Sequence, residues 1–236
     1  HVDPLNPMKD VYDSLSAIET DLVSCRTCDR LVAWREQVGR EKRRAYREDN
    51  YWARPVPGFG DPLARVMVLG LAPGAHGSNR TGRMFTGDGS GKFLYPALHR
   101  AGFANQPDGQ RADDGLVLRD LWITAVCRCV PPDNKPSREE IRNCQPWLEG
   151  EMKLLPNLQG IVALGKIAWD EALRSVVDAH GGKVPAFSHG SLYRPERGEL
   201  WLLGSYHPSR QNTQTGRLTS DMFDEIWSKT RQLLVG

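Results

Sequence analysis

Four short apolar runs alternate with four longer amphipathic segments along this chain, and this alternation restricts the fold more than any other feature. The apolar runs, which are predicted to be buried strands, are residues 63–71, 118–126, 158–165 and 199–207. The segments that follow them, which are predicted to be helices, are residues 91–103, 137–155, 166–180 and 221–235. Strands that alternate with helices form right-handed crossovers and a mostly parallel sheet with helices on both faces. The sequence therefore predicts a three-layer α/β/α fold around a mostly parallel, four-stranded sheet.

Local signals refine the positions of these helices. Apolar residues recur at helical spacing over residues 8–24, which predicts a further helix ending near Cys25. Ser137 and Glu140 have the spacing of a capping box, so we expect a helix to begin there. Pro96 cannot donate a backbone hydrogen bond, so we expect it in the first turn of its helix or at a kink.

The size of the chain fits one folded domain with an appended arm. It has 236 residues, of which 39% are hydrophobic and 25% charged, so it can form both a core and an ordinary polar surface. We expect a single domain over residues 1–236, in which residues 8–60 form an N-terminal helical arm, and a monomer. No apolar run approaches the roughly 20 residues of a membrane span. The first residues, HVDPLNPM, are too polar for a signal peptide, so we expect a cytoplasmic protein.

The net charge of +2 is too small to attract nucleic acid by itself, so any such attraction depends on local clusters. The densest basic stretch is REKRRAYRED, residues 40–49. Acidic residues half-neutralise this stretch. A solvated helix face and a contact with phosphate groups are therefore both open interpretations.

A glycine-rich segment, GLAPGAHGSNRTGRMFTGD, follows the first predicted strand and runs from Gly70 to Asp88. It does not match a P-loop, because Thr86 and Phe93 occupy the glycine and hydroxyl positions that surround the only nearby Gly-Lys pair. It does not match the dinucleotide fingerprint either, because Ala72 replaces the second glycine. Ligands of parallel sheets bind beyond the carboxyl ends of the strands. We therefore expect this segment and the one after His207 to share one site.

The five cysteines lie in two distant parts of the chain. They are Cys25, Cys28, Cys127, Cys129 and Cys144. Without a secretory signal they indicate a reducing compartment, where cysteines serve more often as metal ligands or core residues than in disulfides. Four of them suit a site for zinc or for an iron–sulfur cluster, with either Cys127 or Cys129 as the third ligand. The other interpretation is an isolated C-x-x-C and three core cysteines.

Three stretches together resemble the uracil-DNA glycosylase superfamily, most closely its family 5, or B-type, enzymes. These stretches are GLAPGAHGSNRTGRMFTGD, CVPPDNKPSREEIRNC and YHPSRQNTQTGRLT, and the N-terminal SCRTC agrees with them. The resemblance implies a DNA repair enzyme that flips uracil, and other deaminated bases such as hypoxanthine, out of DNA. Such an enzyme hydrolyses the N-glycosidic bond and leaves an abasic site. The resemblance also implies a structural [4Fe–4S] cluster, held by Cys25, Cys28, Cys129 and Cys144.

The resemblance assigns roles to individual residues. The catalytic residues it implies are Asp88, His207 and Asn134. The substrate-binding residues it implies are Gly70, Leu71, Ala72, Gly74 and Phe85. The DNA-binding residues it implies are Ser209, Arg210, Asn212 and Arg217. The chain departs from the A-type relatives at Leu71 and Ala125, where those enzymes have a glutamate and an asparagine.

Each assignment has a simpler alternative. Asp88 could only cap the helix that follows it, Asn134 could be a turn residue, and His207 could be a structural residue at a strand end. Phe85 could be an ordinary core aromatic. The whole chain could accordingly be a non-catalytic iron–sulfur DNA-binding module, or an electron carrier, which would need no pocket for a base.

Overall fold

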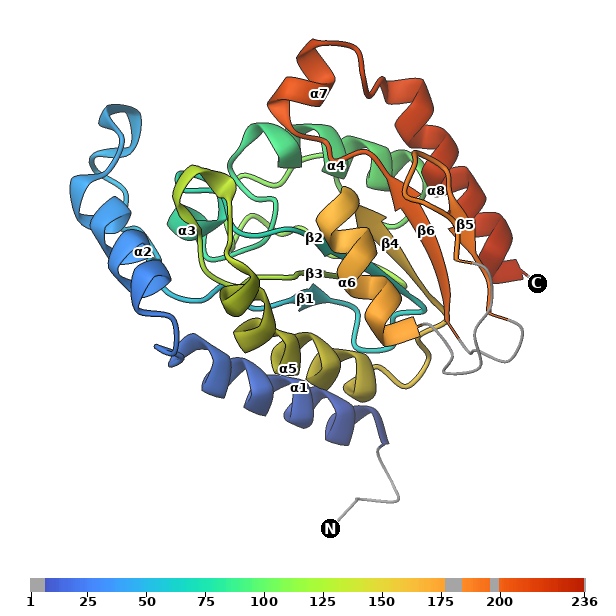
Figure 1. Cartoon of the computed structure of the whole chain (residues 1–236), viewed down its shortest axis with the longest axis horizontal. Helices are drawn as coiled ribbons and strands as arrows, with labels where there is room; N and C mark the ends of the chain where they lie inside the picture. Colours follow the sequence, from blue (N-terminus) through green and yellow to red (C-terminus); the bar gives the residue numbers. More distant parts are fainter. Residues whose placement is uncertain (1–6, 177–183, 196–199, 236) are drawn as a thin grey trace.

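The computed structural model describes residues 7–176, 184–195 and 200–235. Its four longer strands are β2 (Val66–Gly70), β3 (Leu121–Ala125), β4 (Gly160–Leu164) and β6 (Trp201–Ser205). Two-residue strands, β1 (Phe59–Gly60) and β5 (Leu192–Tyr193), lie at the edges of the sheet. The strand order is β1-β3-β2-β4-β6-β5, in which the four longer strands are parallel and both edge strands are antiparallel (Figure 1). The predicted parallel sheet is thus confirmed. The edge strands were not predicted, because two residues carry no periodic pattern.

Helices cover both faces of this sheet, as the three-layer prediction requires (Figure 1). One face carries α4 (Gly89–Arg100) and α8 (Ser220–Val235), and the other carries α1 (Pro7–Val23), α5 (Arg138–Leu154) and α6 (Lys166–Val176). Helix α6 matches the helix predicted over 166–180 as far as Val176. Residues 177–180 lie outside the described residues. The same is true of residue 199 at the start of the last predicted strand. No described helix has both the length and the apolarity that a membrane crossing requires.

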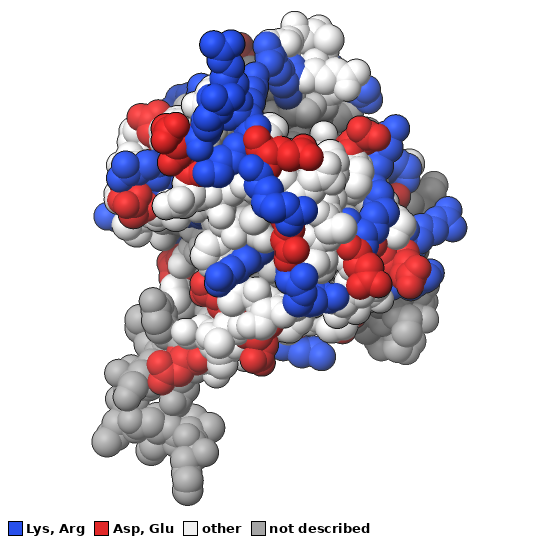
Figure 2. All heavy atoms as spheres, turned by 90° about the vertical axis from the view of Figure 1, so that its left-hand side faces the viewer, with Lys and Arg blue, Asp and Glu red and all other residues white. Residues whose placement is uncertain are grey.

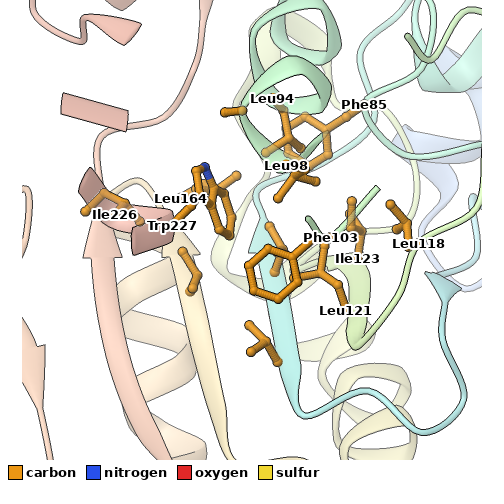
Figure 3. Packing of buried hydrophobic residues seen from close by; sticks show 14 of the residues in the cluster. Phe85, Leu94, Leu98, Phe103, Leu118, Leu121, Ile123, Leu164, Ile226 and Trp227 are labelled. Carbon is orange, nitrogen blue, oxygen red and sulfur yellow. The ribbon is translucent and has the colours of Figure 1, made fainter. Parts of the chain in front are cut away.

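The core lies on both faces of the sheet because buried strand residues alternate in direction. Along β2, Val66 and Val68 belong to one apolar cluster, whereas Met67 and Leu69 belong to the other. Figure 3 shows the first cluster, in which side chains of α4 and α8 meet those of the strands, with Phe85 at its border. Every residue of β2, β3, β4 and β6 is buried, as expected for parallel strands with covered faces.

The helix signals in the sequence are met with one exception. Ser137 caps α5 and makes the complete capping box with Glu140. Pro96 is the eighth residue of α4, which begins at Gly89 rather than near residue 91, so Pro96 does not lie in the first turn. The earlier start comes from Asp88, which acts as the N-cap.

The N-terminal arm contains more structure than the sequence predicted. After α1 the chain forms α2 (Asp29–Glu41) and a short 3-10 helix, η1 (Arg44–Tyr46). Leu31, Val32 and Val38 of α2 are buried. Three further short helices lie in loops: α3 (Ser78–Thr81), η2 (Pro132–Asn134) and α7 (Arg210–Gln214). All three follow carboxyl ends of parallel strands, which is where they can shape a site.

Candidate functional site

A cavity of about 810 Å³ opens beyond the carboxyl ends of the parallel strands. Its walls come from the loops after β2, β3 and β6, together with part of the arm. Strands β3 and β4 lie on opposite sides of β2, so the cavity sits where the strand order reverses, a common ligand position in such sheets. The volume is within the usual range for small-molecule sites. The structure thus brings the glycine-rich segment and the segment after His207 to one cavity.

Phe85 forms part of the cavity floor in an unusual backbone conformation. Its φ of 52° lies in the left-handed region, which costs an ordinary residue on the order of 1 kcal/mol or more. Two glycines make room for it. A Cβ at Gly70 would lie 2.8 Å from Phe85 Cζ, and a Cβ at Gly91 would collide with the Phe85 carbonyl oxygen. The glycine at the end of β2 therefore accommodates the Phe85 ring, and the ring is held in one position beside the cavity.

His207 follows β6 and lines the same cavity. Its main chain is fixed by Asn212, whose Nδ2 donates to the His207 carbonyl oxygen at 2.8 Å. Asn212 is held in turn by its backbone N–H, which donates to Ser209 Oγ at 3.3 Å. Burial lowers the pKa of His207 to about 4, so the imidazole is neutral at pH 7. A neutral imidazole still has one N–H to donate.

Asp88 both caps a helix and lines the cavity. Its Oδ1 accepts a hydrogen bond from the backbone N–H of Gly91 at 2.9 Å, which makes it the N-cap of α4. The carboxylate packs against Gly77, where a Cβ would lie 2.7 Å from Asp88 Cβ, and its Oδ2 lies near Gly74. Burial raises the pKa of Asp88, although hydrogen bonds from backbone N–H groups and the charge of Arg80 oppose the shift. The capping role and a role in the cavity are therefore compatible.

Asn134 lines the edge of the cavity from η2, and its side chain is exposed. Asp133 and Asn134 have φ values of 53° and 56°, so two consecutive non-glycine residues adopt the left-handed conformation. Arg30 of α2 supports this loop by donating to the Lys135 carbonyl oxygen at 3.1 Å. The same guanidinium makes two 2.7 Å hydrogen bonds to the Glu140 carboxylate. The arm thus fixes the base of the loop that carries Asn134.

The residues predicted to contact DNA fall into two groups. Ser209 and Arg210 line the cavity, and the Arg210 side chain is exposed. Asn212 instead supports His207, and Arg217 places its guanidinium 4.8 Å from the centre of the Tyr206 ring. The structure therefore brings all the predicted catalytic and substrate-binding residues to the cavity, but only half of the predicted DNA-binding ones.

The combination of fold and cavity can be compared with known proteins. A model of the uracil DNA glycosylase superfamily matches residues 57–231. The chain belongs to this superfamily. It is 55% identical over 215 residues to the type-5 uracil-DNA glycosylase of Thermus thermophilus, covering 90% of this chain and 94% of the relative.

Two further relatives have the same name. The type-5 uracil-DNA glycosylase of Mycobacterium bovis is 51% identical, over 89% of this chain and 78% of the relative. That of Pyrobaculum aerophilum is 44% identical, over 87% of each. The superfamily resemblance is confirmed, and so is the three-layer fold predicted from the alternation of strands and helices.

Two positions at which this chain departs from the A-type glycosylases of the superfamily both face the cavity. Leu71 and Ala125 line it, so an apolar side chain and a methyl group stand where a carboxylate and an amide were expected in those relatives. The polar lining is supplied from elsewhere, by Asp88, Asn134 and His207.

Several cavity residues were not predicted. Arg43 and Tyr46 reach the cavity from the arm, and His76 and Lys92 reach it from the loop after β2 and from α4. His76 Nδ1 is 2.8 Å from the Tyr51 hydroxyl, which joins the glycine-rich segment to the arm. The position of His76 within the glycine-rich segment was a usable signal. Arg43 and Tyr46 belong to the basic stretch for which the sequence left a phosphate contact open, but their place at the cavity depends on tertiary packing.

The cysteines gather between the arm and α5. A second, small cavity is lined by Cys25, Cys28, Cys129 and Cys144, whereas Cys127 is buried beside Cys144 and does not line it. In the part of the chain that the structure describes, no three His, Cys, Asp or Glu side chains converge as a single metal ion requires. The four thiols surround a space instead. These four cysteines are therefore the residues that could hold a metal centre between the arm and α5.

Proposed function

We propose that this chain is a monofunctional uracil-DNA glycosylase, a DNA repair enzyme that hydrolyses the N-glycosidic bond of uracil in DNA and leaves an abasic site. The observation that carries this proposal is the meeting of Phe85, Asp88 and His207 in one cavity at the strand ends. Relatives named type-5 uracil-DNA glycosylases, at 44–55% identity, agree with it. A DNA-binding module without catalysis would not need this combination.

The base-binding part of the mechanism follows from Phe85 and His207. A glycosylase must take its target nucleotide out of the stack before it can reach the bond. The fixed Phe85 ring offers a face for the flipped base, and such stacking is worth roughly 1–3 kcal/mol per base. As the bond breaks, negative charge develops on the uracil. The neutral His207 donates a hydrogen bond to the carbonyl oxygen on which this charge gathers.

The sugar-binding part depends on Asp88. Loss of the base leaves positive charge on the deoxyribose, which a nearby carboxylate stabilises. Asp88 is held by the Gly91 N–H through one oxygen, so the carboxylate does not rotate away from the cavity. It also acts as the group that orients the attacking water or accepts its proton. The negative charge therefore comes from Asp88 at the start of α4. Leu71, which follows β2, carries no charge.

The breadth of substrate selection depends on Asn134. Its amide has both donors and an acceptor, so it can match the edges of several bases. Its side chain is exposed at the cavity edge rather than enclosed, which allows the amide to adapt. We therefore extend the proposal to other deaminated bases, including hypoxanthine.

We further propose that Cys25, Cys28, Cys129 and Cys144 hold a [4Fe–4S] cluster. Support comes from Arg35, a buried residue whose Nη1 donates to Cys129 Sγ at 3.0 Å and to the Cys25 carbonyl oxygen at 3.2 Å. Among the described residues Arg35 has no carboxylate partner. A buried guanidinium without a counter-charge is costly. Cysteine thiolates around a cluster supply the negative charge that Arg35 lacks.

This cluster would be structural. Two of its ligands precede α2 and two come from the β3–α5 region, so it would fasten the arm to the unit that carries Asn134. Cys28→Ser tests the assignment, with Cys127→Ser as the matched control. We expect the first variant to lose bound iron and visible absorbance, and the second to keep both. Iron retained in Cys28→Ser, or zinc in the wild-type protein, would contradict the proposal.

We also propose that the enzyme acts as a monomer in the cytoplasm. Asp88, Asn134 and His207, the three residues given catalytic roles, line one cavity of a single chain. The cytoplasm is proposed because a repair glycosylase must reach the DNA that it scans. Size-exclusion chromatography with light scattering tests the first statement.

The activity is tested with labelled duplex oligonucleotides that contain one uracil, one hypoxanthine or neither. Alkali converts each abasic site into a strand break, so cleavage reports base removal. We expect cleavage of the uracil and hypoxanthine strands and none of the undamaged strand. Binding of DNA without cleavage of the uracil strand would contradict the proposed activity and favour the DNA-binding module.

A further inference from the structure

The basic stretch after α2 stands at the rim of the cavity, although the sequence left its role open. Arg43 and Tyr46 line the cavity on this side, and Ser209 and Arg210 line it from the segment after β6. In Figure 1 the loop after α2 and helix α7 lie on two sides of the loops that form the cavity. A strand that delivers a base to this cavity therefore meets one cationic segment on each side.

Three arginines of this stretch have charges available for a ligand. Arg43, Arg44 and Arg47 are exposed, and within the described residues none of them forms a salt bridge. The acidic residues nearby are partly engaged elsewhere, since Asp49 pairs with Arg80 at 2.7 Å. Figure 2 shows Lys and Arg side chains gathered over the upper part of this face, the end at which the loop after α2 lies in Figure 1. In the folded chain, the nearby acidic residues therefore neutralise less of the positive charge of this stretch than the sequence suggested.

The segment is also held firmly against the glycine-rich loop. The Arg43 backbone N–H donates to the Tyr51 hydroxyl at 3.2 Å, and that hydroxyl is 2.8 Å from His76 Nδ1. The Arg80 guanidinium lies 3.9 Å from the centre of the Tyr46 ring. These contacts fix the backbone between Arg43 and Tyr46 relative to the cavity. A solvated helix face would not need such anchoring.

We propose that residues 43–47 form a second DNA-binding element, which contacts the phosphates that flank the flipped nucleotide on the side of the cavity away from Arg210. The partner chemistry is that of the phosphodiester backbone, because exposed arginines contact phosphate oxygens without reading sequence. This inference rests on the proposed function for its substrate. It goes beyond that function in assigning part of the affinity for DNA to the N-terminal arm.

The test compares two triple variants with the same loss of charge. One is Arg43→Gln/Arg44→Gln/Arg47→Gln. The control is Arg119→Gln/Lys153→Gln/Arg174→Gln, three exposed cations near the amino ends of the parallel strands, away from the cavity. Dissociation constants for a uracil-containing duplex and an undamaged duplex are measured by fluorescence anisotropy over a range of salt concentrations. Melting curves confirm that each variant folds.

We expect the arm variant to bind both duplexes about tenfold more weakly and the slope of log Kd against log salt to fall by about 1 or more. The control variant should match the wild-type affinity and slope. Wild-type affinity in the arm variant, or equal losses in both variants, would overturn the inference. If the triple variant does not fold, Arg44→Gln/Arg47→Gln gives the same comparison with a smaller expected loss.

The outcome is separable from the proposed function. A wild-type protein that binds DNA through the arm but releases no uracil supports the DNA-binding element and contradicts the activity. A protein that releases uracil, but whose affinity for DNA does not change with the arm substitutions, supports the activity and contradicts the DNA-binding element.

Discussion

The rings of Phe85 and His207 lie with their centres 5.9 Å apart and their planes inclined by 32°. Phe85 comes from the loop after β2 and His207 from the end of β6, two strands that β4 separates in the sheet. A base resting on Phe85 would therefore have an edge near the imidazole. The fold holds this relationship through glycines that admit the Phe85 ring and through Asn212, which fixes the His207 main chain.

The position of Phe85 makes Gly70 sensitive to a single methyl group. In Gly70→Ala the new Cβ would lie 2.8 Å from Phe85 Cζ, so the ring must shift. We expect single-turnover excision of uracil to slow by roughly tenfold, in line with the loss of part of a 1–3 kcal/mol stacking contact. Gly89→Ala is the control, because its Cβ meets no atom within 4 Å. Equal rates in Gly70→Ala and the wild type would show that Phe85 does not support the base.

The double role of Asp88 gives opposite stability effects for two substitutions. Asn is as good an N-cap as Asp, whereas Ala costs about 1 kcal/mol of folding free energy. Burial raises the pKa of Asp88, so its ionisation at pH 7 opposes folding, and Asp88→Asn removes this cost. We expect Asp88→Asn to equal or exceed the wild-type free energy of unfolding at pH 7, and Asp88→Ala to lose about 1 kcal/mol. Denaturant unfolding measures both. A less stable Asp88→Asn than Asp88→Ala would contradict the capping geometry.

The lowered pKa of His207 predicts a dependence of stability on pH. Between about 4, its folded pKa, and 6.5, its ordinary value, the unfolded state binds more protons than the folded state. The contribution of His207 to the free energy of unfolding therefore rises with pH across this window and is lost as pH falls through it. We expect His207→Gln to depend less on pH than the wild type between pH 4.5 and 6.5. His99→Gln, which removes an exposed histidine of α4, controls for the loss of a histidine. If the free energies of unfolding of His207→Gln and the wild type change with pH in parallel, burial does not lower the pKa of His207.

Arg30 is predicted to act on excision through the loop that carries Asn134. Arg30→Met removes the pair with Glu140 and the hydrogen bond to the Lys135 carbonyl oxygen. We expect excision to slow by several-fold while the free energy of unfolding changes by less than about 1 kcal/mol, because the Arg30 side chain is about half exposed. The matched control is Arg26→Met, which breaks the exposed pair with Glu36. A large loss of stability without a slower reaction, or equal effects of both variants, would contradict a positioning role.

Much of the fold was predictable because it depends on local periodicity. The central strands are continuous apolar runs, such as VMVLG of β2, and the helices between them carry clear apolar spacing. Edge strands of two residues have no period, so β1 and β5 escaped prediction. A helical arm was predicted over residues 8–60, but not the bounds of α2, whose contribution to the core depends on the buried Arg35 as well as on apolar residues.

The candidate site was predictable where motifs lie in single stretches. The segments ending at Asp88 and beginning at His207 both contribute to the cavity, as expected for loops at strand carboxyl ends. The supporting contacts were not predictable. Arg30 and Glu140, like Arg35 and Cys129, are far apart in sequence and meet only in the folded chain. Local spacing also could not show that Gly70 accommodates an aromatic ring, since that depends on the left-handed backbone of Phe85.

The most direct test of the central claim is the single-turnover release of uracil from a duplex by three proteins: the wild type, Asp88→Asn and Asp133→Asn. Both aspartates line the cavity, but Asp133 is exposed and only Asp88 is held at the start of α4. We predict that the wild type and Asp133→Asn release uracil at rates within a few-fold of each other. We predict that Asp88→Asn is slower by about 10²-fold or more, the range for loss of a positioned acid or base. Equal release by Asp88→Asn and the wild type, or an equal loss in Asp133→Asn, would contradict the account.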